Sequence, residues 1–152
     1  MSLSIYVLSC SDNKYYVGKT KNLDARIKSH FYSYPDVVWL KLYKPVKLLQ
    51  VYADQTSFDE DKFTIQYMSE YGIDNVRGGS FTTVNLSKEE KNVIEKMIIG
   101  STDCCYKCKK KGHFAKDCKY IPQAISIKST NKDCKYKISL YDILEDLWDF
   151  CR

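Results

Sequence analysis

Three cysteines and one histidine with a characteristic spacing constrain this chain more than any other feature of its sequence. Cys105, Cys108, His113 and Cys118 follow the pattern C-x2-C-x4-H-x4-C. Three thiolates and one imidazole complete a tetrahedral set for Zn²⁺ and leave no coordination position open, so the pattern predicts a structural zinc site. Gly112, before the histidine, allows a backbone conformation that other residues resist. A segment this short buries too little surface to fold without its metal.

Positive charge is concentrated around this pattern. Residues 100–137 hold 10 basic and 3 acidic side chains, residues 1–99 hold 13 and 12, and residues 138–152 hold 1 and 4. A local basic excess is typical of a segment that contacts a polyanion, so we expect nucleic acid to bind here.

The N-terminus and the lengths of the apolar runs indicate the cellular compartment of the protein. The N-terminus lacks a secretory signal pattern, and no apolar run is long enough to span a membrane. We therefore expect an intracellular protein with no membrane contact, in nucleus or cytoplasm, where thiols stay reduced and cysteines are more often metal ligands or buried apolar groups than disulfides.

Hydrophobic patterns predict alternating strands and helices before residue 100. Strands are expected at 4–10, 15–18 and 46–52, the first two as a hairpin. The capping and stop signals predict helices from Asn22 to before Pro35, from Thr56 or Ser57 to Tyr71 with Gly72 as C-cap, and from the capping box Ser87–Glu90 to Ile99. Residues 74–80 are predicted to be a loop because they contain Gly78-Gly79. Beyond residue 119, short strands are expected at 125–128 and 137–141, and a helix at 141–150.

The zinc pattern resembles the retroviral-type zinc knuckle over residues 105–118, including Gly112 and Tyr106. This resemblance implies binding of single-stranded DNA or RNA. Tyr106 and Phe114 are candidates for stacking on bases, and packing around the zinc loop is the alternative for each. The candidates for phosphate contacts are Lys107, Lys109, Lys110, Lys111, Lys116 and Lys119.

Two short tyrosine motifs mark the N-terminal part. Ser4-Ile5-Tyr6 and Tyr16-Val17-Gly18 are followed by Lys-Thr-Lys-Asn-Leu and then by Arg26. Residues 3–85 resemble the GIY-YIG endonuclease family, with Ser4 where the family usually has glycine. The resemblance implies a small three-stranded antiparallel sheet flanked by helices. The predicted fold class is therefore α+β, with a nuclease-like domain at 1–100, a CCHC zinc knuckle at 104–119 and a tail at 120–152.

The resemblance implies a catalytic set. A carboxylate must hold a divalent ion, Mg²⁺ or Mn²⁺, and Glu60 is the candidate, with Asp59 and Asp61 as alternatives. A cation must stabilise the charge at phosphorus, and the Arg26 guanidinium can bridge two phosphate oxygens.

Four further residues belong to this set. Tyr6 and Tyr16 are candidates for orienting water or relaying a proton, and either could be the base. His30 shares a helix face with Arg26 and is a candidate for proton transfer, with a plain surface position as the alternative. Lys19 is expected to contact phosphate. Asn75 is expected either to support the site or to bind the loop backbone.

The sequence thus predicts a metal-dependent DNA endonuclease with an appended zinc knuckle, similar to proteins of large DNA viruses or mobile elements. One alternative is a nucleic-acid-binding protein with an inactive nuclease domain. Another is an RNA-processing nuclease. The sequence gives no indication of an oligomeric state.

Overall fold

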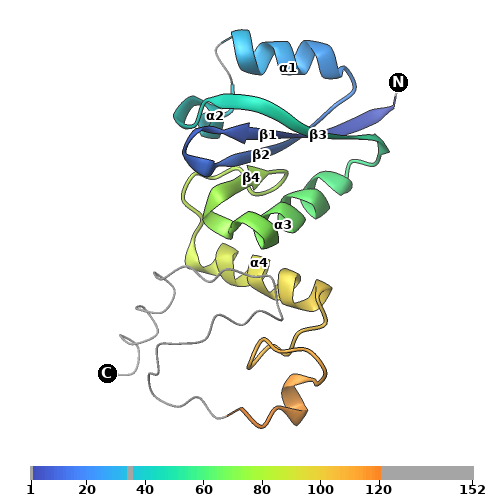
Figure 1. Ribbon diagram of the computed structural model, residues 1–152, viewed down its shortest axis with the longest axis vertical. Helices are drawn as coiled ribbons and strands as arrows, with labels where there is room; N and C mark the ends of the chain where they lie inside the picture. Colours follow the sequence, from blue (N-terminus) through green and yellow to red (C-terminus); the bar gives the residue numbers. More distant parts are fainter. Residues whose placement is uncertain (1, 34–35, 121–152) are drawn as a thin grey trace.

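A computed structural model of the chain describes residues 2–33 and 36–120. Within these ranges one mixed sheet has the order β3-β1-β2-β4 (Figure 1), with strands β1 (Leu3–Cys10), β2 (Tyr15–Thr20), β3 (Pro45–Gln55) and β4 (Val76–Gly78). The helices are α1 (Leu23–Tyr32), α2 (Val38–Leu42), α3 (Asp59–Tyr71) and α4 (Lys88–Ser101). The predicted α+β class is confirmed. The predictions for the tail at 121–152 and for Pro35 lie outside the described residues.

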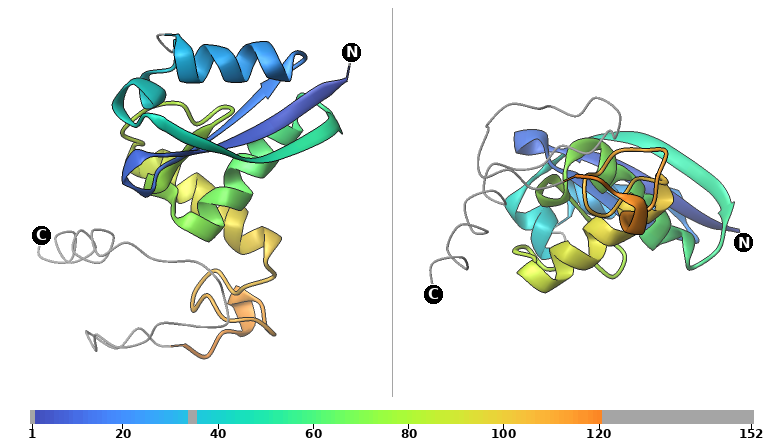
Figure 2. Two further views of the ribbon diagram at one scale, coloured as in Figure 1. Left: turned by 45° about the horizontal axis from the view of Figure 1, so that its top comes forward. Right: turned by 90° about the horizontal axis from the view of Figure 1, so that it is seen from below.

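Alternate side chains of the central strands build two separate cores, because successive residues of a strand point to opposite faces. On one face Ile5, Val7 and Val17 pack with residues of α3 and α4. On the other face Tyr6 and Tyr16 pack with Trp39 and Leu40 of α2 and with apolar residues of α1. The sheet therefore separates α1 and α2 from α3 and α4, and the left view in Figure 2 shows α1 on one side of the sheet and α3 and α4 on the other.

The sheet has four strands where three were predicted. Residues 76–78 were expected to lie in a loop, but β4 pairs in parallel with residues 15–17 of β2. Gly78 approaches β2 so closely that a Cβ there would collide with the main-chain oxygen of Val17. The glycine that suggested a loop thus permits the strand pairing. Helix α2 was also not predicted.

Three of the helices have the capping residues that the sequence predicted. The Asn22 side chain accepts from Ala25 N at 3.1 Å, and the capping box of Ser87 and Glu90 is present, so both predicted caps are confirmed. Gly72 ends α3 with φ at +97°, as predicted.

The start of α3 differs from the prediction. Neither Thr56 nor Ser57 caps this helix, which begins at Asp59 after Phe58. Instead, Asp59 Oδ2 accepts from Thr56 N at 2.8 Å and from its Oγ1 at 2.6 Å. The acidic side chain in the first turn thus binds the preceding loop.

None of the helices in the described ranges has both the length and the apolar composition needed to cross a membrane.

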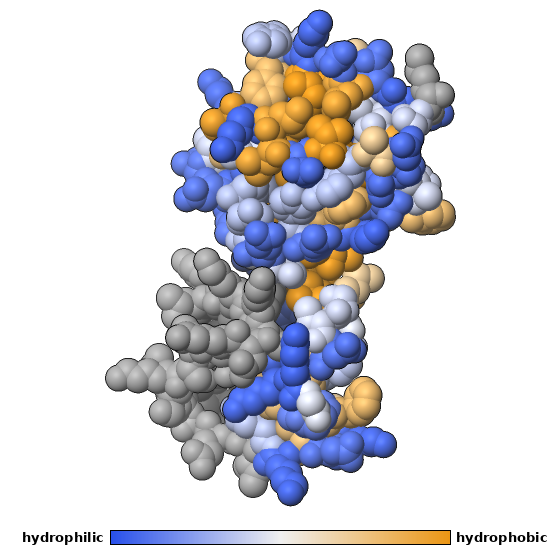
Figure 3. Space-filling view, turned by 45° about the vertical axis from the view of Figure 1, so that its right-hand side comes forward, coloured by the Kyte–Doolittle hydropathy of each residue, from blue (hydrophilic) through white to orange (hydrophobic). Residues whose placement is uncertain are grey.

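The face drawn in Figure 3 shows apolar residues gathered at the end of the molecule that holds the sheet and α1. The described atoms at the opposite end, where the zinc pattern lies, are mostly hydrophilic.

Candidate active site and zinc site

Tyr6 and Tyr16 lie side by side on the face of the sheet that α1 covers. Tyr6 is directly opposite Gly18 in the β1–β2 pairing, so Tyr16 is its diagonal neighbour, with ring centroids 6.3 Å apart. A Cβ at Gly18 would collide with the Tyr6 phenol. The glycine of the Tyr-Val-Gly motif therefore makes room for the first tyrosine.

Helix α1 places Arg26 and His30 over these rings, one turn apart. His30 Nε2 lies 2.7 Å from Tyr6 Oη, and Arg26 Nε donates to the same oxygen at 3.4 Å. His30 is 3% exposed, so it is not a surface residue. The Tyr6 hydroxyl is thus the meeting point of both α1 side chains.

Burial governs the protonation states in this cluster. Burial, with a smaller contribution from the Arg26 charge, lowers the pKa of His30 to about 4, so the imidazole is neutral at neutral pH. Burial raises the pKa of Tyr6, although Arg26 opposes this. Burial, followed by the effects of Tyr6 and Glu60, raises the pKa of Tyr16. Both phenols therefore keep their protons, and Tyr6 can donate to an unprotonated His30 Nε2.

Three consecutive acids open α3, and their surroundings distinguish them. Asp59 binds Thr56, as described above, and Asp61 accepts from Ser80 N at 2.6 Å and Ser80 Oγ at 2.7 Å. Both of these carboxylates hold loops. The Glu60 carboxylate instead meets Lys19 Nζ at 2.9 Å, with 12% of its side chain exposed. Its charge also raises the pKa of Tyr6 and Tyr16, after burial, which places it in their surroundings.

Lys19, expected to contact phosphate, is paired with Glu60. Its side chain is 44% exposed, so the ammonium group faces both the carboxylate and solvent. Lys19 can therefore reach a phosphate oxygen from the solvent side, but the largely buried Glu60 carboxylate would then need another cation.

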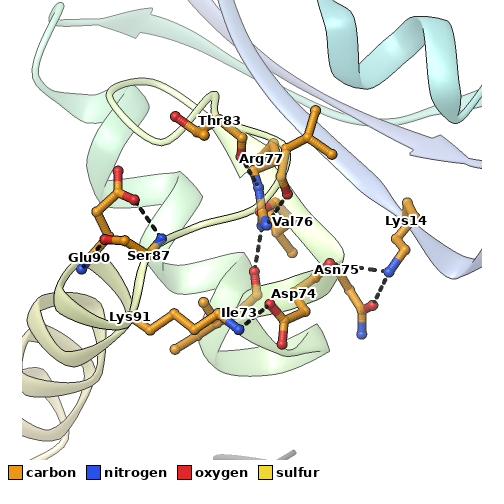
Figure 4. Close-up of polar contacts among 11 residues, drawn as sticks. Lys14, Ile73, Asp74, Asn75, Val76, Arg77, Thr83, Ser87, Glu90 and Lys91 are labelled. Carbon is orange, nitrogen blue, oxygen red and sulfur yellow. Dashed lines mark hydrogen bonds and ion pairs between the residues drawn. The ribbon is translucent and has the colours of Figure 1, made fainter. Parts of the chain in front are cut away.

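Asn75 takes part in a different network, and Figure 4 shows its contact with Lys14. Its Nδ2 donates to Tyr71 O at 2.8 Å, and its Oδ1 accepts from Lys14 Nζ at 2.8 Å. These bonds join the end of α3 to the β1–β2 turn. They support the alternative that Asn75 binds the loop backbone.

Arg77 was not singled out from the sequence. It is 1% exposed and donates to four main-chain carbonyls, those of Ile73, Val76, Thr83 and Val84 (Figure 4). Its guanidinium also lies 4.6 Å from the Trp39 ring centroid. This arginine ties the loop before α4 to the sheet, and the Arg-Gly-Gly sequence gave no signal of that role.

The predicted zinc ligands come together. One ligand atom from each of Cys105, Cys108, His113 and Cys118 lies within 4.8 Å of every other. Gly112 has φ at +93°, the conformation expected before the histidine. Three sulfurs and an imidazole nitrogen clustered in this way match the donors of a structural Zn²⁺ site.

The surface around this cluster carries the predicted nucleic-acid contacts unequally. Phe114 is 76% exposed and Tyr106 is 54% exposed. Lys109 is only partly exposed and pairs with Glu95 of α4 at 3.5 Å. The other five lysines of the predicted set in this segment are exposed: Lys107, Lys110, Lys111, Lys116 and Lys119.

Two matches to family models coincide with these two regions. Residues 2–60 match the GIY-YIG catalytic domain, and residues 103–119 match the zinc knuckle. Residues 2–60 thus form a GIY-YIG catalytic domain, and residues 103–119 form a CCHC zinc knuckle. The first match spans Tyr6 to Glu60, whereas Asn75 lies outside it. The searches of curated proteins and of solved structures gave no match.

Proposed function

We propose that this chain is a metal-dependent endonuclease that hydrolyses phosphodiester bonds in DNA, and that its knuckle supplies affinity for nucleic acid. The observation that carries the proposal is the hydrogen-bonded group of Tyr6, Arg26 and His30. It adjoins Tyr16 and the Glu60–Lys19 pair. Strands β1 and β2 and helices α1 and α3 thus bring together a cation, a carboxylate and phenols, the groups that phosphodiester hydrolysis requires.

Glu60 is the residue that would hold the divalent ion. A single, slightly exposed carboxylate suits Mg²⁺ or Mn²⁺, which bind through one or two carboxylates, substrate phosphates and water. The bound ion supplies charge neutralisation and activates water. In this proposal Lys19 exchanges the Glu60 carboxylate for a substrate phosphate, which frees Glu60 for the metal.

Arg26 and Tyr6 act on the reacting phosphate. The Arg26 Nε–H meets Tyr6, so the Nη groups remain for phosphate oxygens, and the positive charge lies where negative charge develops. We assign the base to Tyr6 because its hydroxyl has a neutral acceptor in His30. His30 then orients the phenol and receives its proton as the proton from water arrives.

The test is cleavage by the zinc-loaded full chain of duplex, branched and single-stranded DNA, and of the matching RNA, with and without magnesium. The proposal expects magnesium-dependent cuts in DNA. Cuts in RNA alone would favour the RNA-processing alternative. Binding to every substrate without any cut would favour the inactive-nuclease alternative.

A matched pair of variants ties activity to this site. Glu60→Gln removes the proposed metal ligand, whereas Glu89→Gln changes an exposed acid in the first turn of α4. We expect Glu60→Gln to lose cleavage and Glu89→Gln to keep it. Equal cleavage by both variants would exclude Glu60 as the ligand.

A further inference from the structure

The zinc knuckle follows α4 without a free linker. After the last helical residue, Ser101, Thr102 N donates to Ile98 O at 3.2 Å, and Thr102 Oγ1 donates to the same oxygen at 3.0 Å. Cys104 N then donates to Ile99 O at 3.2 Å. The next residue, Cys105, is the first zinc ligand and is 1% exposed. The backbone is therefore hydrogen-bonded to the helix up to the metal site.

Two side chains of the knuckle also contact α4. Lys109 pairs with Glu95 at 3.5 Å, and about a quarter of each side chain is exposed, 30% and 22% respectively. Tyr106 lies against the last turn, because a Cβ at Gly100 would be 2.9 Å from its hydroxyl. The knuckle is thus held at the end of α4 and also at Glu95, between one and two turns further back along the helix.

Helix α4 is itself anchored in the core. Ile94 is 0% exposed and Ile98 is 3% exposed, and both belong to the same cluster as Val7 and Val17 of the sheet. Helix α4 packs on α3 within this core and is hydrogen-bonded to the start of the knuckle at its C-terminal end, so it fixes the position of the knuckle. The knuckle therefore has a set place relative to the tyrosines of β1 and β2.

That place is at the far end of the molecule from the candidate active site. Tyr6, Arg26 and His30 lie between the sheet and α1, whereas the knuckle lies beyond α3 and α4, at the opposite end of the long axis (Figures 1 and 2). Two helix layers, each about 10–12 Å across, separate the sheet from the knuckle, a span of roughly 20 Å. Along B-form DNA, this span equals about six base pairs at 3.4 Å each.

We propose that the knuckle is a fixed arm that holds single-stranded nucleic acid at a point at least about six base pairs of duplex from the cleaved bond. This inference rests on the proposed nuclease function and specifies its substrate as duplex DNA with a single-stranded tail or branch. The exposed Phe114 ring and the exposed lysines, such as Lys110 and Lys111, supply a stacking surface and cations. The cut is then placed by the distance from the junction between single strand and duplex.

The test compares two insertions of the same short, flexible Gly-Ser segment. In one variant it follows Thr102 and separates the knuckle from α4, and in the control it follows Tyr120, beyond the knuckle. Cut positions are mapped on duplexes whose single-stranded tail begins at different places in one sequence. We expect wild type and control to cut at one distance from the junction, whichever sequence lies there. The Thr102 insertion should spread the cuts over several positions.

The spacing can be read without cleavage, which separates this inference from the proposed function. Footprinting of the zinc-loaded protein without magnesium reports where the knuckle binds. Backbone amide relaxation measured by NMR reports whether the two parts tumble together. A chain that cuts nothing would overturn the nuclease proposal, yet one tumbling time and one footprint spacing would still support the fixed arm. Separate tumbling in the wild type, or equally sharp cuts and footprints after the Thr102 insertion, would overturn it.

Discussion

The GIY-YIG domain and the zinc knuckle position their functional groups by different means. In the nuclease domain, Tyr6, Arg26 and Glu60 come from separate elements and meet because two hydrophobic cores pack on the two faces of one sheet. In the knuckle, all four ligands come from one short segment and converge because a metal can bind them. The first site therefore depends on folding of the domain, and the second depends on zinc.

This difference predicts how each part responds to damage. Each buried apolar side chain stabilises the nuclease fold by about 1.5–3 kcal/mol, so the loss of one contact should not unfold the domain. The knuckle has few buried apolar groups, and metal binding supplies its folding energy. Each variant below alters one of the two parts, and the measurement shows whether the effect stays in that part.

Loss of a zinc ligand should have the largest effect. Cys108→Ser removes one of the four donors, and structural zinc contributes roughly 10–16 kcal/mol in isolated knuckle-sized peptides. We expect metal analysis to find one zinc in the wild type and none in the variant, with loss of order confined to the knuckle and the last turn of α4. Circular dichroism should show the other helices intact. Unfolding of the whole chain on zinc loss would contradict the comparison.

Removal of the candidate catalytic cation should come next. Arg26→Ala should lower the turnover number on the order of 100-fold or more, because a positioned charge acts on the developing negative charge. Lys28→Ala, an exposed change on the same helix, should leave turnover unchanged. Steady-state kinetics with magnesium in excess measures both. Equal losses of turnover in the two variants would show that catalysis depends on the overall positive charge of α1 and not on the contact between Arg26 and Tyr6.

Burial of His30 should make stability pH-dependent. Its folded pKa, about 4, lies below the ordinary value of 6.5, so the unfolded state binds the proton more readily. Stability is complete above pH 6.5 and falls as the pH drops, until the loss ends near pH 4. The expected loss is about 1–3 kcal/mol.

Denaturant unfolding of wild type and His30→Gln at several pH values measures this effect. The knuckle contributes equally to both proteins, so the difference between their slopes reports His30. Identical slopes would contradict a buried neutral imidazole.

The two aromatic rings of the knuckle should differ in binding. Phe114→Ala should weaken binding to single-stranded DNA by about 1–3 kcal/mol, because a stacked base is lost. Tyr106→Ala should cost less, since its hydroxyl lies against α4 at Gly100. Fluorescence titration at one salt concentration ranks the two. A larger loss for Tyr106→Ala would show that this ring, and not Phe114, stacks on bases.

Salt dependence should give the smallest change. For single strands each phosphate contact contributes about 0.7 to the slope of log affinity against log salt, so Lys110→Ala with Lys111→Ala should reduce that slope by about 1.4. Lys109→Ala should change it less, because Lys109 pairs with Glu95. A salt series of titrations decides this. An unchanged slope in the double variant would remove these lysines from the interface.

Local patterns predicted the knuckle and most of the elements, but not what depends on long-range contacts. The capping box at Ser87 and the C-cap at Gly72 are confirmed because their partners are near in sequence. Strand β4 was missed because its pairing partner, β2, is remote, and its Gly-Gly sequence is typical of loops.

The candidate site shows the same limit. From the sequence, Glu60 was the candidate ligand, and Asp59 and Asp61 stayed open as alternatives. The structure distinguishes them by their partners: Ser80 donates a hydrogen bond to Asp61, and Lys19 forms an ion pair with Glu60. The burial of His30 likewise follows from the packing of α1 on the sheet, which no pattern within the helix reports.

The most direct test of this division between the two parts is steady-state kinetics of two variants on one tailed DNA duplex. Arg26→Ala alters the nuclease domain, and Phe114→Ala alters the exposed ring of the knuckle. We predict that Arg26→Ala lowers kcat with little change in KM, and that Phe114→Ala raises KM with kcat unchanged. A fall in kcat for Phe114→Ala, or a rise in KM alone for Arg26→Ala, would contradict it.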